Sequence, residues 1–463
     1  MIKTVILAAG EGTRMKSEKS KVLHKILNKT ILSYIIDAVN FGDDSEIIIV
    51  AGKNYYDLKN MYPEMIIKKQ EIGKNIPYGT GYATSLCIDE IKGGDTVLVL
   101  NGDIPLIKKE SISEFLRKHK ENDDDGSVLS VKIKDPSGYG RIVRKNNEFV
   151  KIIEEKDADE NQRKIDEINS GIYAFKGKEL KDSLKKLNSK NKSKELYLTD
   201  CIGILNSEGK KVNAFENKNY KEFFGINNKY ELSFANEIMR ERVNEKYMIE
   251  GVIIENPSIT TIQPGVKIGN DTEISGCVSI LGNTTIGKNC IIKGSCRIEN
   301  SQIGDNVIID NSIIEESKIE NGVDIGPFSH LRPNAMLKEN VHIGNFVEVK
   351  NSTVGEKTKA GHLAYIGDSD IGKNVNIGCG VIFVNYDGTF KHRSIVKDNA
   401  FIGSNSNIVA PVTIENEGYI AAGSTITENV AKGELSIERS KQINKPGYVE
   451  KKKIRDEKLK EEK

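Results

Sequence analysis

A run of small and apolar residues ends the first strand-like segment of the chain, at Leu7, Ala8, Ala9 and Gly10. Small residues let a backbone approach a phosphate closely, and a loop that leads into a helix points N–H groups at the anion. Arg14 and Lys21 follow in the loop, and both could neutralise further phosphate charge. The spacing matches neither G-x-G-x-x-G nor a Walker lysine followed by Ser or Thr. Glycine spacing alone leaves two interpretations open, a phosphate-binding loop and an ordinary tight turn.

A second polar group, Asn101-Gly102-Asp103, directly follows the apolar segment 96–100. Ligands of α/β sheets bind outside the carboxyl ends of the strands, so this position suits a ligand site. Taken alone, Asp103 is equally well explained as a helix cap or a turn residue.

Residues 1–228 alternate strand and helix signals. The apolar segments 4–8, 46–50 and 96–100 are short enough for buried parallel strands, and residues 31–39 are typical of a helix. This alternation predicts an α/β domain with helices on both faces of a sheet. In residues 229–250, apolar residues recur at three- and four-residue steps, which predicts an amphipathic helical linker.

Residues 251–446 carry aliphatic side chains at a six-residue step. The step is seen at Ile262, Ile268, Ile274, Ile280, Ile286, Ile292 and Ile298, at Ile319, Ile325, Leu331, Leu337, Ile343 and Val349, and at Ile402, Ile408, Ile414, Ile420 and Ile426. Neither a helix nor a strand has this period. A repeat of only six residues predicts stacked coils, each of which buries its aliphatic row on its neighbours. The phase slips near Ile303, near Val354 and over 384–396, where extra residues are expected to bulge out as loops. Residues 447–463 are a charged tail.

Composition limits the function classes. The chain has 463 residues and a net charge of +1, so nothing points to nucleic acid or to a membrane as a partner. No run approaches the roughly 18 apolar residues of a membrane span, and the start shows no signal peptide. The six cysteines form no C-x-x-C pair, which favours a reduced, cytoplasmic protein.

The ordered motifs of the first half resemble the signature of the sugar-1-phosphate nucleotidylyltransferases. They are the segment 7–15, Lys21-Val22-Leu23-His24, Gly79-Thr80-Gly81, Asn101-Gly102-Asp103, Tyr139-Gly140-Arg141-Ile142, Glu154, Asn169-Ser170-Gly171 and Gly225-Ile226-Asn227-Asn228. Taken together with the six-residue aliphatic repeat that follows them in the chain, these motifs resemble the bifunctional N-acetylglucosamine-1-phosphate uridylyltransferases and glucosamine-1-phosphate acetyltransferases. The resemblance covers all of the chain except the tail. The resemblance implies a Rossmann-like nucleotidyltransferase domain with a mixed sheet, followed by a left-handed parallel β-helix.

The resemblance also implies roles for these residues. Asp103 and Asn227 would hold Mg²⁺, and Arg14 and Lys21 would stabilise the triphosphate as the catalytic cations. UTP and the product UDP-N-acetylglucosamine would bind at Leu7, Ala8, Ala9, Gly10, Lys21, Gln70, Gly79, Thr80, Gly140, Glu154, Asn169 and Asn227. The oxygen of a sugar phosphate is already anionic, so its attack on the α-phosphorus needs alignment and charge neutralisation and no strong base. Mg²⁺ suits such a site, because it typically takes one or two protein ligands besides phosphates.

One segment departs from the family pattern. A glutamine normally lies a few residues before Gly-Thr-Gly, where it reads the uracil, but here the segment Gln70–Tyr78 is longer by about four residues. Either Gln70 fills that role through a longer loop, or the base contact differs. The chain could therefore be a relative with shifted sugar or base specificity.

The second half resembles the acetyltransferase part of the same family. His362, within Lys359-Ala360-Gly361-His362-Leu363-Ala364-Tyr365, would accept the proton that a glucosamine amine loses as it attacks a thioester. A surface or packing histidine is the alternative. Arg332 and Lys350 match cation positions for the sugar phosphate and are 18 residues apart, one full coil, so both can lie on one face. Tyr365 and Asn376 would orient the sugar. The acetyl-CoA positions would be Cys379, Asn385, Tyr386, Ser404, Ala422 and Arg439.

Cys379 replaces the small residue, usually Ala, of the family. A backbone N–H that stabilises the oxyanion survives this change. The rival idea, Cys379 as an acyl-carrying nucleophile, is disfavoured because no neighbour is evident to lower its pKa.

The sequence thus predicts a cytoplasmic enzyme that acetylates glucosamine-1-phosphate and then couples the product to UTP, for peptidoglycan and lipopolysaccharide precursors. The family's acetyltransfer sites lie between subunits, which implies a homotrimer. One rival is a nucleotidylyltransferase with a single activity whose solenoid only trimerises it. Another is a zinc hydratase on a similar solenoid, but His342 and His362 lie 20 residues apart, off the coil register.

Overall fold

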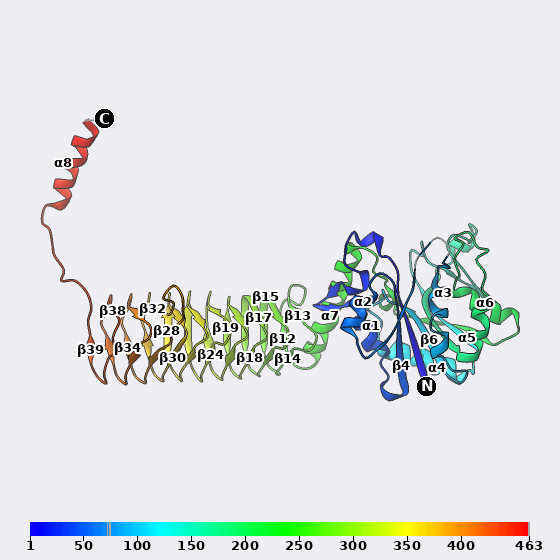
Figure 1. The fold of residues 1–463 in the computed structure, drawn as a ribbon, viewed down its shortest axis with the longest axis horizontal. Helices are drawn as coiled ribbons and strands as arrows, with labels where there is room; N and C mark the ends of the chain where they lie inside the picture. The colour runs from blue at the N-terminus through cyan, green and yellow to red at the C-terminus, as the bar shows by residue number, and fades with distance from the viewer. Residues whose placement is uncertain (72, 74–75, 462–463) are drawn as a thin grey trace. The chain divides into compact units, whose positions relative to one another are not determined.

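The computed structural model describes residues 1–71, 73 and 76–461, which form two compact units, Met1–Glu241 and Arg242–Lys463. The division falls within the long helix α7 (Lys229–Ile249). No helix of the described residues is long and apolar enough to cross a bilayer. Figure 1 shows the helices and strands of both units.

The first unit is built on a nine-stranded mixed sheet. The main strands are, in spatial order, β11 (Val212–Asn217), β7 (Gly126–Lys132), β10 (Glu167–Lys176), β6 (Thr96–Asn101), β1 (Ile2–Ala8), β4 (Ser45–Ala51) and β5 (Ile66–Lys69), with β8 (Arg141–Lys145) and β9 (Glu148–Ile153) attached beside β10. Strands β6, β1, β4 and β5 run parallel, whereas β10 is antiparallel to β6 and β7. The predicted strands and the α/β class are confirmed. Because β1 and β6 are neighbours with Leu7 opposite Asn101, the segments after both strands meet at one edge.

Six helices of the first unit accompany this sheet. They are α1 (Ile31–Val39), α2 (Tyr55–Met61), α3 (Thr80–Ser85), α4 (Lys109–Glu121), α5 (Gly177–Leu184) and α6 (Thr199–Ser207), in the order of the chain. The helix predicted over residues 31–39 is confirmed, and Thr30 caps it by accepting from the Ser33 N–H. The expectation that the loop after β1 leads into a helix is only partly right. It leads into a single 3₁₀ turn, η1 (Thr13–Met15), and then into a second, η2 (Lys21–Leu23).

The second unit is a left-handed parallel β-helix whose coils have three faces. Face A holds β12 (Ile253–Ile254), β19 (Ile308–Asp310), β22 (Asp324–Ile325), β25 (His342–Asn345), β28 (Lys359–His362), β31 (Asn376–Ile377), β34 (Phe401–Ile402), β37 (Tyr419–Ile420) and β39 (Leu435–Ser436). Face B holds β13 (Thr261–Ile262), β20 (Ile313–Glu315), β23 (His330–Leu331), β26 (Glu348–Lys350), β29 (Tyr365–Gly367), β32 (Ile382–Val384), β35 (Asn407–Val409) and β38 (Thr425–Ile426). The long strands β15 (Glu273–Leu281) and β17 (Ile291–Glu299) turn the corner between faces A and B.

Face C holds the third row of strands. They are β14 (Lys267–Ile268), β16 (Thr285–Ile286), β18 (Gln302–Ile303), β21 (Lys318–Ile319), β24 (Met336–Leu337), β27 (Thr353–Val354), β30 (Ser369–Ile371), β33 (Ser394–Val396) and β36 (Thr413–Ile414). Most of the aliphatic ladder is buried inside, and one continuous hydrophobic core runs from Tyr247 to Val430. The tail contains helix α8 (Tyr448–Glu461), which has no buried residue.

The lengths of the coils correct one prediction. Ile268 pairs with Ile286, 18 positions on, but Ile286 pairs with Ile303 and Val354 with Ile371, both 17 positions on. The phase slips near Ile303 and Val354 therefore come from shortened turns, and no loop bulges out there. The third slip is a true insertion, because Ile371 pairs with Val396, 25 positions on.

The inward-facing aliphatic ladder predicts that substitutions at neighbouring residues of β19 differ sharply in their effect on the free energy of unfolding. Ile309 is fully buried, whereas Ile308, beside it, is 39% exposed. We expect Ile309→Ala to lower the free energy of unfolding by about 2–5 kcal/mol, because it removes buried methyl groups and leaves a cavity. Ile308→Ala should change it by less than about 1 kcal/mol. Urea unfolding followed by circular dichroism measures both, and equal losses would contradict the inward ladder.

Candidate functional site

Two adjoining cavities of the first unit, of about 430 and 400 Å³, open at the carboxyl edge of β1 and β6. Both are lined by Leu7, Arg14, Thr80, Asn101, Asp103, Glu195 and Asn227. The smaller cavity adds Ala8, Ala9, Gly10, Lys21, Gln70 and Gly79, and the larger adds Gly140, Glu154 and Asn169. All residues that the sequence assigned to the nucleotidyl-transfer site therefore lie around one divided hollow.

A polar cluster lies where the two cavities meet. The Lys21 ammonium donates to Asp103 Oδ2 at 2.6 Å and to Asn227 Oδ1 at 3.3 Å. The Arg14 guanidinium donates to the same Asn227 oxygen at 2.9 Å. Asp103 comes from the end of β6 and Asn227 from the turn before α7, and the N–H of Ile226 donates to the Asp103 carbonyl and joins these segments. Residues 124 positions apart thus share one charged centre.

This cluster fits a hard cation. The oxygens of Asp103 and Asn227 converge on one positive group, the Lys21 ammonium, so two oxygen donors already face one point. The described residues contain no group of three or more His, Cys, Asp or Glu side chains that could hold a metal. Mg²⁺ commonly binds through one or two protein oxygens and takes its other ligands from phosphate and water, so the pair is sufficient for it.

The larger cavity ends in a polar pocket around Glu154. The Thr199 hydroxyl donates to Glu154 Oε1 at 3.1 Å, and burial raises the pKa of the Glu154 carboxyl. The Asn169 amide donates to the Tyr173 hydroxyl at 2.6 Å, and the Asn169 N–H donates to the Gly140 carbonyl at 2.9 Å. A pocket with fixed acceptors and donors suits a hydroxyl-rich ligand such as a sugar.

The smaller cavity is bounded by the turn before α3. Gly79 has a φ of 116°, and a Cβ there would lie 2.4 Å from the Leu196 carbonyl oxygen, so only glycine fits. The Thr80 hydroxyl accepts from the Leu198 N–H and fastens this turn. Gln70 is buried, and its N–H donates to the Ala51 carbonyl at the end of β4. Of the unusual segment 70–78, residues 72, 74 and 75 lie outside the described residues.

The second unit places His362 at the corner between faces A and B. His362 Nδ1 lies 2.6 Å from Asn345 Oδ1, and the two residues are opposite each other in adjacent coils. An amide oxygen only accepts, so this contact places the ring proton on Nδ1 and leaves Nε2 free to take another. His362 is exposed.

The predicted sugar-phosphate residues occupy two faces. Arg332, Lys350 and Tyr365 lie in three consecutive coils of face B, since Leu331 pairs with Val349 and Glu348 with Tyr365. Asn376 lies on face A, in register with Lys359. Within a single chain, Asn376 on face A is therefore separated by the corner of the coil from the three residues on face B.

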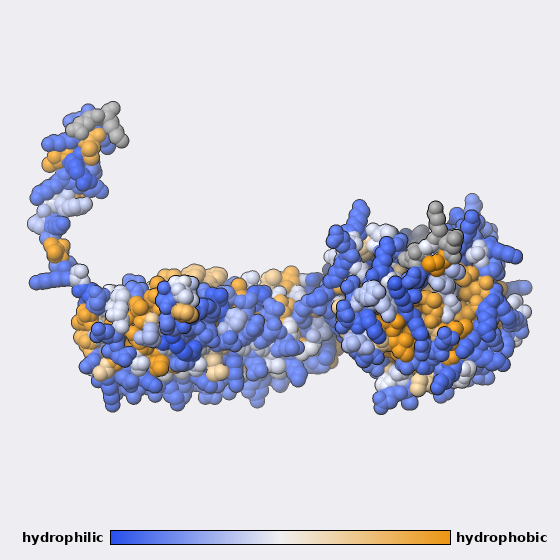
Figure 2. Space-filling view, viewed as in Figure 1, coloured by the Kyte–Doolittle hydropathy of each residue, from blue (hydrophilic) through white to orange (hydrophobic). Residues whose placement is uncertain are grey.

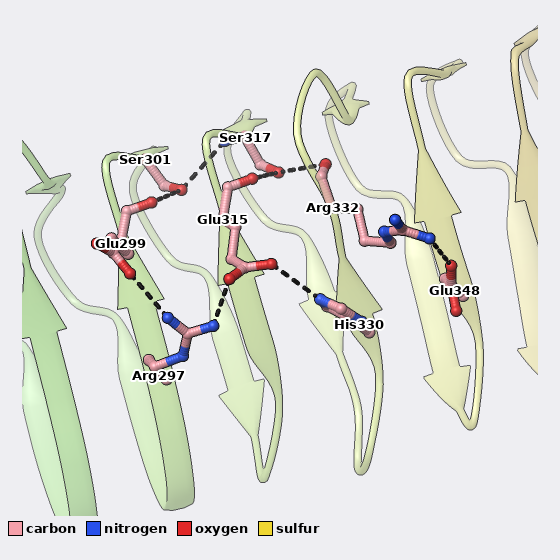
Figure 3. A network of polar contacts seen from close by, with 8 residues as sticks. All are labelled: Arg297, Glu299, Ser301, Glu315, Ser317, His330, Arg332 and Glu348. Carbon is pink, nitrogen blue, oxygen red and sulfur yellow. Dashed lines mark hydrogen bonds and ion pairs between the residues drawn. The ribbon is translucent and has the colours of Figure 1, made fainter.

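Face B carries a row of charges that leads to this site, as Figure 3 shows. Arg297 pairs with Glu299 and Glu315, and His330 lies 3.1 Å from Glu315. In the next coils, Arg332 donates to Glu348 at 2.8 Å. Arg332 is 41% exposed and so remains accessible to an anion beside its carboxylate partner.

Four of the predicted coenzyme residues, Cys379, Ser404, Ala422 and Arg439, form a single row. Ala360, Ile377, Ile402 and Ile420 are stacked partners on face A, and the residues two positions later are His362, Cys379, Ser404 and Ala422. The Cys379 carbonyl accepts from Asn405, the Ser404 carbonyl from Gly423, and the Ala422 carbonyl from Arg439 Nη1 at 2.8 Å. From His362 to Arg439 the row spans four strand spacings, on the order of 19 Å. An elongated ligand could lie along it.

The remaining predicted pair belongs to the inserted segment after β32. Asn385 is buried, and its amide donates to Asp368 and, at 3.4 Å, to the Tyr365 hydroxyl. Tyr386 is 57% exposed and pairs with Lys391 across a hairpin.

Sequence reasoning missed several neighbours of these sites. Tyr197 and Thr199 line the larger cavity, and Asn345 contacts His362. The coil offset of 17 residues between Asn345 and His362 could have revealed their contact, because nearby pairs share it. Tyr197 and Thr199 carry no comparable spacing signal.

Known proteins resemble the chain over nearly its whole length. A nucleotidyl transferase family model matches residues 3–231. The Bifunctional protein GlmU of Clostridioides difficile strain 630 is 47% identical over 459 residues, which cover 99% of each chain. Proteins of the same name from Alkaliphilus oremlandii and Caldicellulosiruptor saccharolyticus are each 46% identical, over 97% and 96% of this chain and 98% and 96% of their own.

Identity of this extent covers both units. The same chain has a divided polar hollow in its α/β unit and, in its β-helix, an exposed histidine at the head of a row of stacked residues. The chain therefore belongs to the bifunctional GlmU family.

Proposed function

We propose that this enzyme makes UDP-N-acetylglucosamine in two steps, each performed by the residues described above. We assign nucleotidyl transfer to residues 1–228 and acetyl transfer to residues 251–446, with a helical linker at 229–250 and a tail at 447–463. The observation that supports this division is that each unit brings its own two cations to neighbouring positions, Arg14 and Lys21 in one and Arg332 and Lys350 in the other.

Acetyl transfer needs a proton acceptor beside the amine. The nitrogen of glucosamine-1-phosphate attacks the thioester carbon of acetyl-CoA, the C–N bond forms, the C–S bond breaks, and the thiolate leaves. His362 Nε2 takes the proton from the amine, because Asn345 holds the other ring nitrogen in its protonated form. The row at Cys379, Ser404 and Ala422 would hold the coenzyme arm, with the Cys379 backbone N–H toward the oxyanion.

Uridylyl transfer needs charge neutralisation. An oxygen of N-acetylglucosamine-1-phosphate attacks the α-phosphorus of UTP, and pyrophosphate leaves. Arg14 and Lys21 lie at the junction of the two cavities and would neutralise the triphosphate, while Gly140, Glu154 and Asn169 orient the sugar. Mg²⁺ held by Asp103 and Asn227 would supply further positive charge at the phosphates.

A homotrimer would complete the acetyltransfer site. Asn376 lies around the corner from Arg332, Lys350 and Tyr365, so a neighbouring copy can bring the two sets together. Large apolar residues are also exposed on that corner, and Figure 2 shows hydrophobic residues at the surface of this unit. Phe328 and Phe346 stack with ring centroids 5.6 Å apart. Both have a positive φ, 62° and 58°, as the corner of each coil requires, and a bulky residue is unfavourable there, which supports a role for these side chains in a contact.

We assign the enzyme to the cytoplasm. Its proposed co-substrates, UTP and acetyl-CoA, are intracellular metabolites, and its product would feed cell-wall sugar synthesis. All six cysteines are free thiols, as expected in a reducing compartment.

The nucleotidyl-transfer site is tested by Asp103→Ala. This change removes one proposed Mg²⁺ ligand and the partner of Lys21, so pyrophosphate release from UTP should fall by about 10²–10³-fold. Release of free CoA by the same preparation should stay within about twofold, because the acetyl site lies in the other unit. Asp89→Ala, at an exposed carboxylate, serves as the control. An unchanged rate of pyrophosphate release would refute the assignment.

The proton acceptor is tested by the pair His362→Gln and Asn345→Asp. His362→Gln should lower the rate of CoA release by about 10²–10⁴-fold, since it removes the general base. Asn345→Asp places a carboxylate beside Nδ1, which stabilises the imidazolium relative to the neutral ring. The acid limb of the pH–rate profile should then move to higher pH. If the limb stays where it is in the wild-type enzyme, Asn345 does not set the state of His362.

The oligomer is tested by Phe328→Asn together with Phe346→Asn. Asparagine tolerates a positive φ, so the coils should stay folded while the apolar contact is lost. The wild-type protein should sediment at three times the 51.4 kDa mass of one chain, and the double variant at a lower mass with reduced acetyl transfer. A wild-type monomer at micromolar concentration would contradict the trimer.

A further inference from the structure

A buried asparagine, Asn54, connects the two ends of the loop that lines the smaller cavity of the first unit. It lies in the turn between β4 and α2, and it is 5% exposed. Its amide nitrogen donates to the Ala8 carbonyl at 3.3 Å and to the Ser20 hydroxyl at 3.1 Å. Ala8 ends β1, and Ser20 directly precedes Lys21. One side chain therefore joins the end of the first strand to the residue before the lysine.

The orientation of this amide is fixed from its other side. The Gly52 N–H donates to Asn54 Oδ1 at 3.0 Å, so the nitrogen is the amide atom that faces the loop. A Cβ at Gly52 would lie 2.6 Å from the Ala9 carbonyl oxygen, so the turn packs closely on the loop. Asn54 is the N-cap residue of α2, yet its side chain makes no capping hydrogen bond. Its hydrogen bonds therefore stabilise the loop and its own turn and leave the helix end uncapped.

The loop between these two ends has mainly local backbone bonds. Its 3₁₀ turn, η1, is closed by the Met15 N–H, which donates to the Gly12 carbonyl. The Ser20 carbonyl accepts from the Leu23 N–H and so begins the second turn, η2, whose first residue is Lys21. Bonds of this kind shape each turn but do not fix where the turn lies relative to β1. The contact between Asn54 and Ser20 does so, because it reaches across from another segment.

The place of Lys21 matters, because a cation neutralises phosphate charge only at short range and in the right direction. Asn54 itself lines neither cavity, so its effect on a bound nucleotide passes through the loop. We propose that Asn54 is a positioning residue for nucleotidyl transfer, which anchors Ser20 to the end of β1 and thereby holds Lys21 against the triphosphate. This inference rests on the proposed uridylyl transfer and adds a residue that does not touch the substrate.

The kinetics of pyrophosphate release test the proposal in Asn54→Ala and Ser20→Ala. In Asn54→Ala, kcat/KM for UTP should fall about 5- to 30-fold, because two hydrogen bonds that hold the loop are lost. KM for N-acetylglucosamine-1-phosphate should stay within about twofold, since Glu154 and Asn169 are unchanged. Ser20→Ala should give a smaller loss, and the double variant should be no worse than Asn54→Ala, because both changes break the same contact. Asn60→Ala, at an exposed asparagine of α2, should behave as wild type.

Ser20→Pro separates positioning of the loop from packing of the side chain. Ser20 has a φ of −54°, close to the value that a proline ring fixes. The ring should restrain the end of the loop without the hydroxyl, so kcat/KM for UTP should stay within about threefold of wild type. Added to Asn54→Ala, the same change should recover most of the loss.

Other outcomes would overturn the proposal. An unchanged kcat/KM for UTP in Asn54→Ala would show that this residue does not position the loop. An equal rise of KM for UTP and for the sugar phosphate, or no recovery with Ser20→Pro, would show that Asn54 only supports the fold of the unit.

A second measurement does not depend on catalysis. Amide hydrogen exchange of the full chain without substrate, followed by mass spectrometry, reports opening of the loop through peptides that cover residues 9–24. Exchange in these peptides should be faster in Asn54→Ala than in the wild-type protein and in Asn60→Ala, while peptides of β10 should not change. Equal exchange in all three proteins would overturn the proposal. If the wild-type enzyme releases no pyrophosphate from UTP, the proposed function fails, and exchange still decides whether Asn54 holds the loop.

Discussion

The buried aliphatic row of the β-helix is the constraint on which its proposed chemistry depends. Each coil must present an aliphatic residue to the one below, so strand pairing is locked in register. Side chains two positions beyond the buried residue then stack at one corner, which is how His362, Cys379, Ser404 and Ala422 form a row. The ladder therefore does more than stabilise the unit, because it converts coil length into the spacing of the proposed coenzyme residues.

A different constraint organises the first unit. Neighbouring parallel strands end at the same edge of a sheet, so Asp103 after β6 meets the loop after β1. Asn227 is added by the turn before α7, and the Ile226 N–H secures that turn to the Asp103 carbonyl. Lys21 and Arg14 hold the two oxygen donors at hydrogen-bond distance. The cations and the oxygen donors are balanced locally, so a chain of nearly zero net charge still concentrates positive charge at the proposed triphosphate site.

The sequence predicted those features that come from periodicity and from ordered motifs. The helix at 31–39, the strands around 4–8, 46–50 and 96–100 and the solenoid follow from side-chain patterns that the backbone obeys. The prediction of an inserted loop near Ile303 was wrong, because a gain and a loss of residues change the phase of the repeat in the same way and the coil is in fact shortened. The coil offset of 17 residues could have revealed the Asn345–His362 contact. The sequence did not predict how the inserted segment folds back between Tyr386 and Lys391, because no repeat encodes the conformation of a hairpin.

The most direct measurement of the central claim is a crystal structure of the enzyme with Mg²⁺, UTP, acetyl-CoA and glucosamine-1-phosphate. The account predicts triphosphate density against Arg14 and Lys21, the coenzyme arm along the row from Cys379 to Arg439, and the thioester beside His362. It also predicts sugar phosphate between Arg332 and Lys350. Coenzyme bound away from that corner, or nucleotide outside the hollow at Asp103, would contradict it.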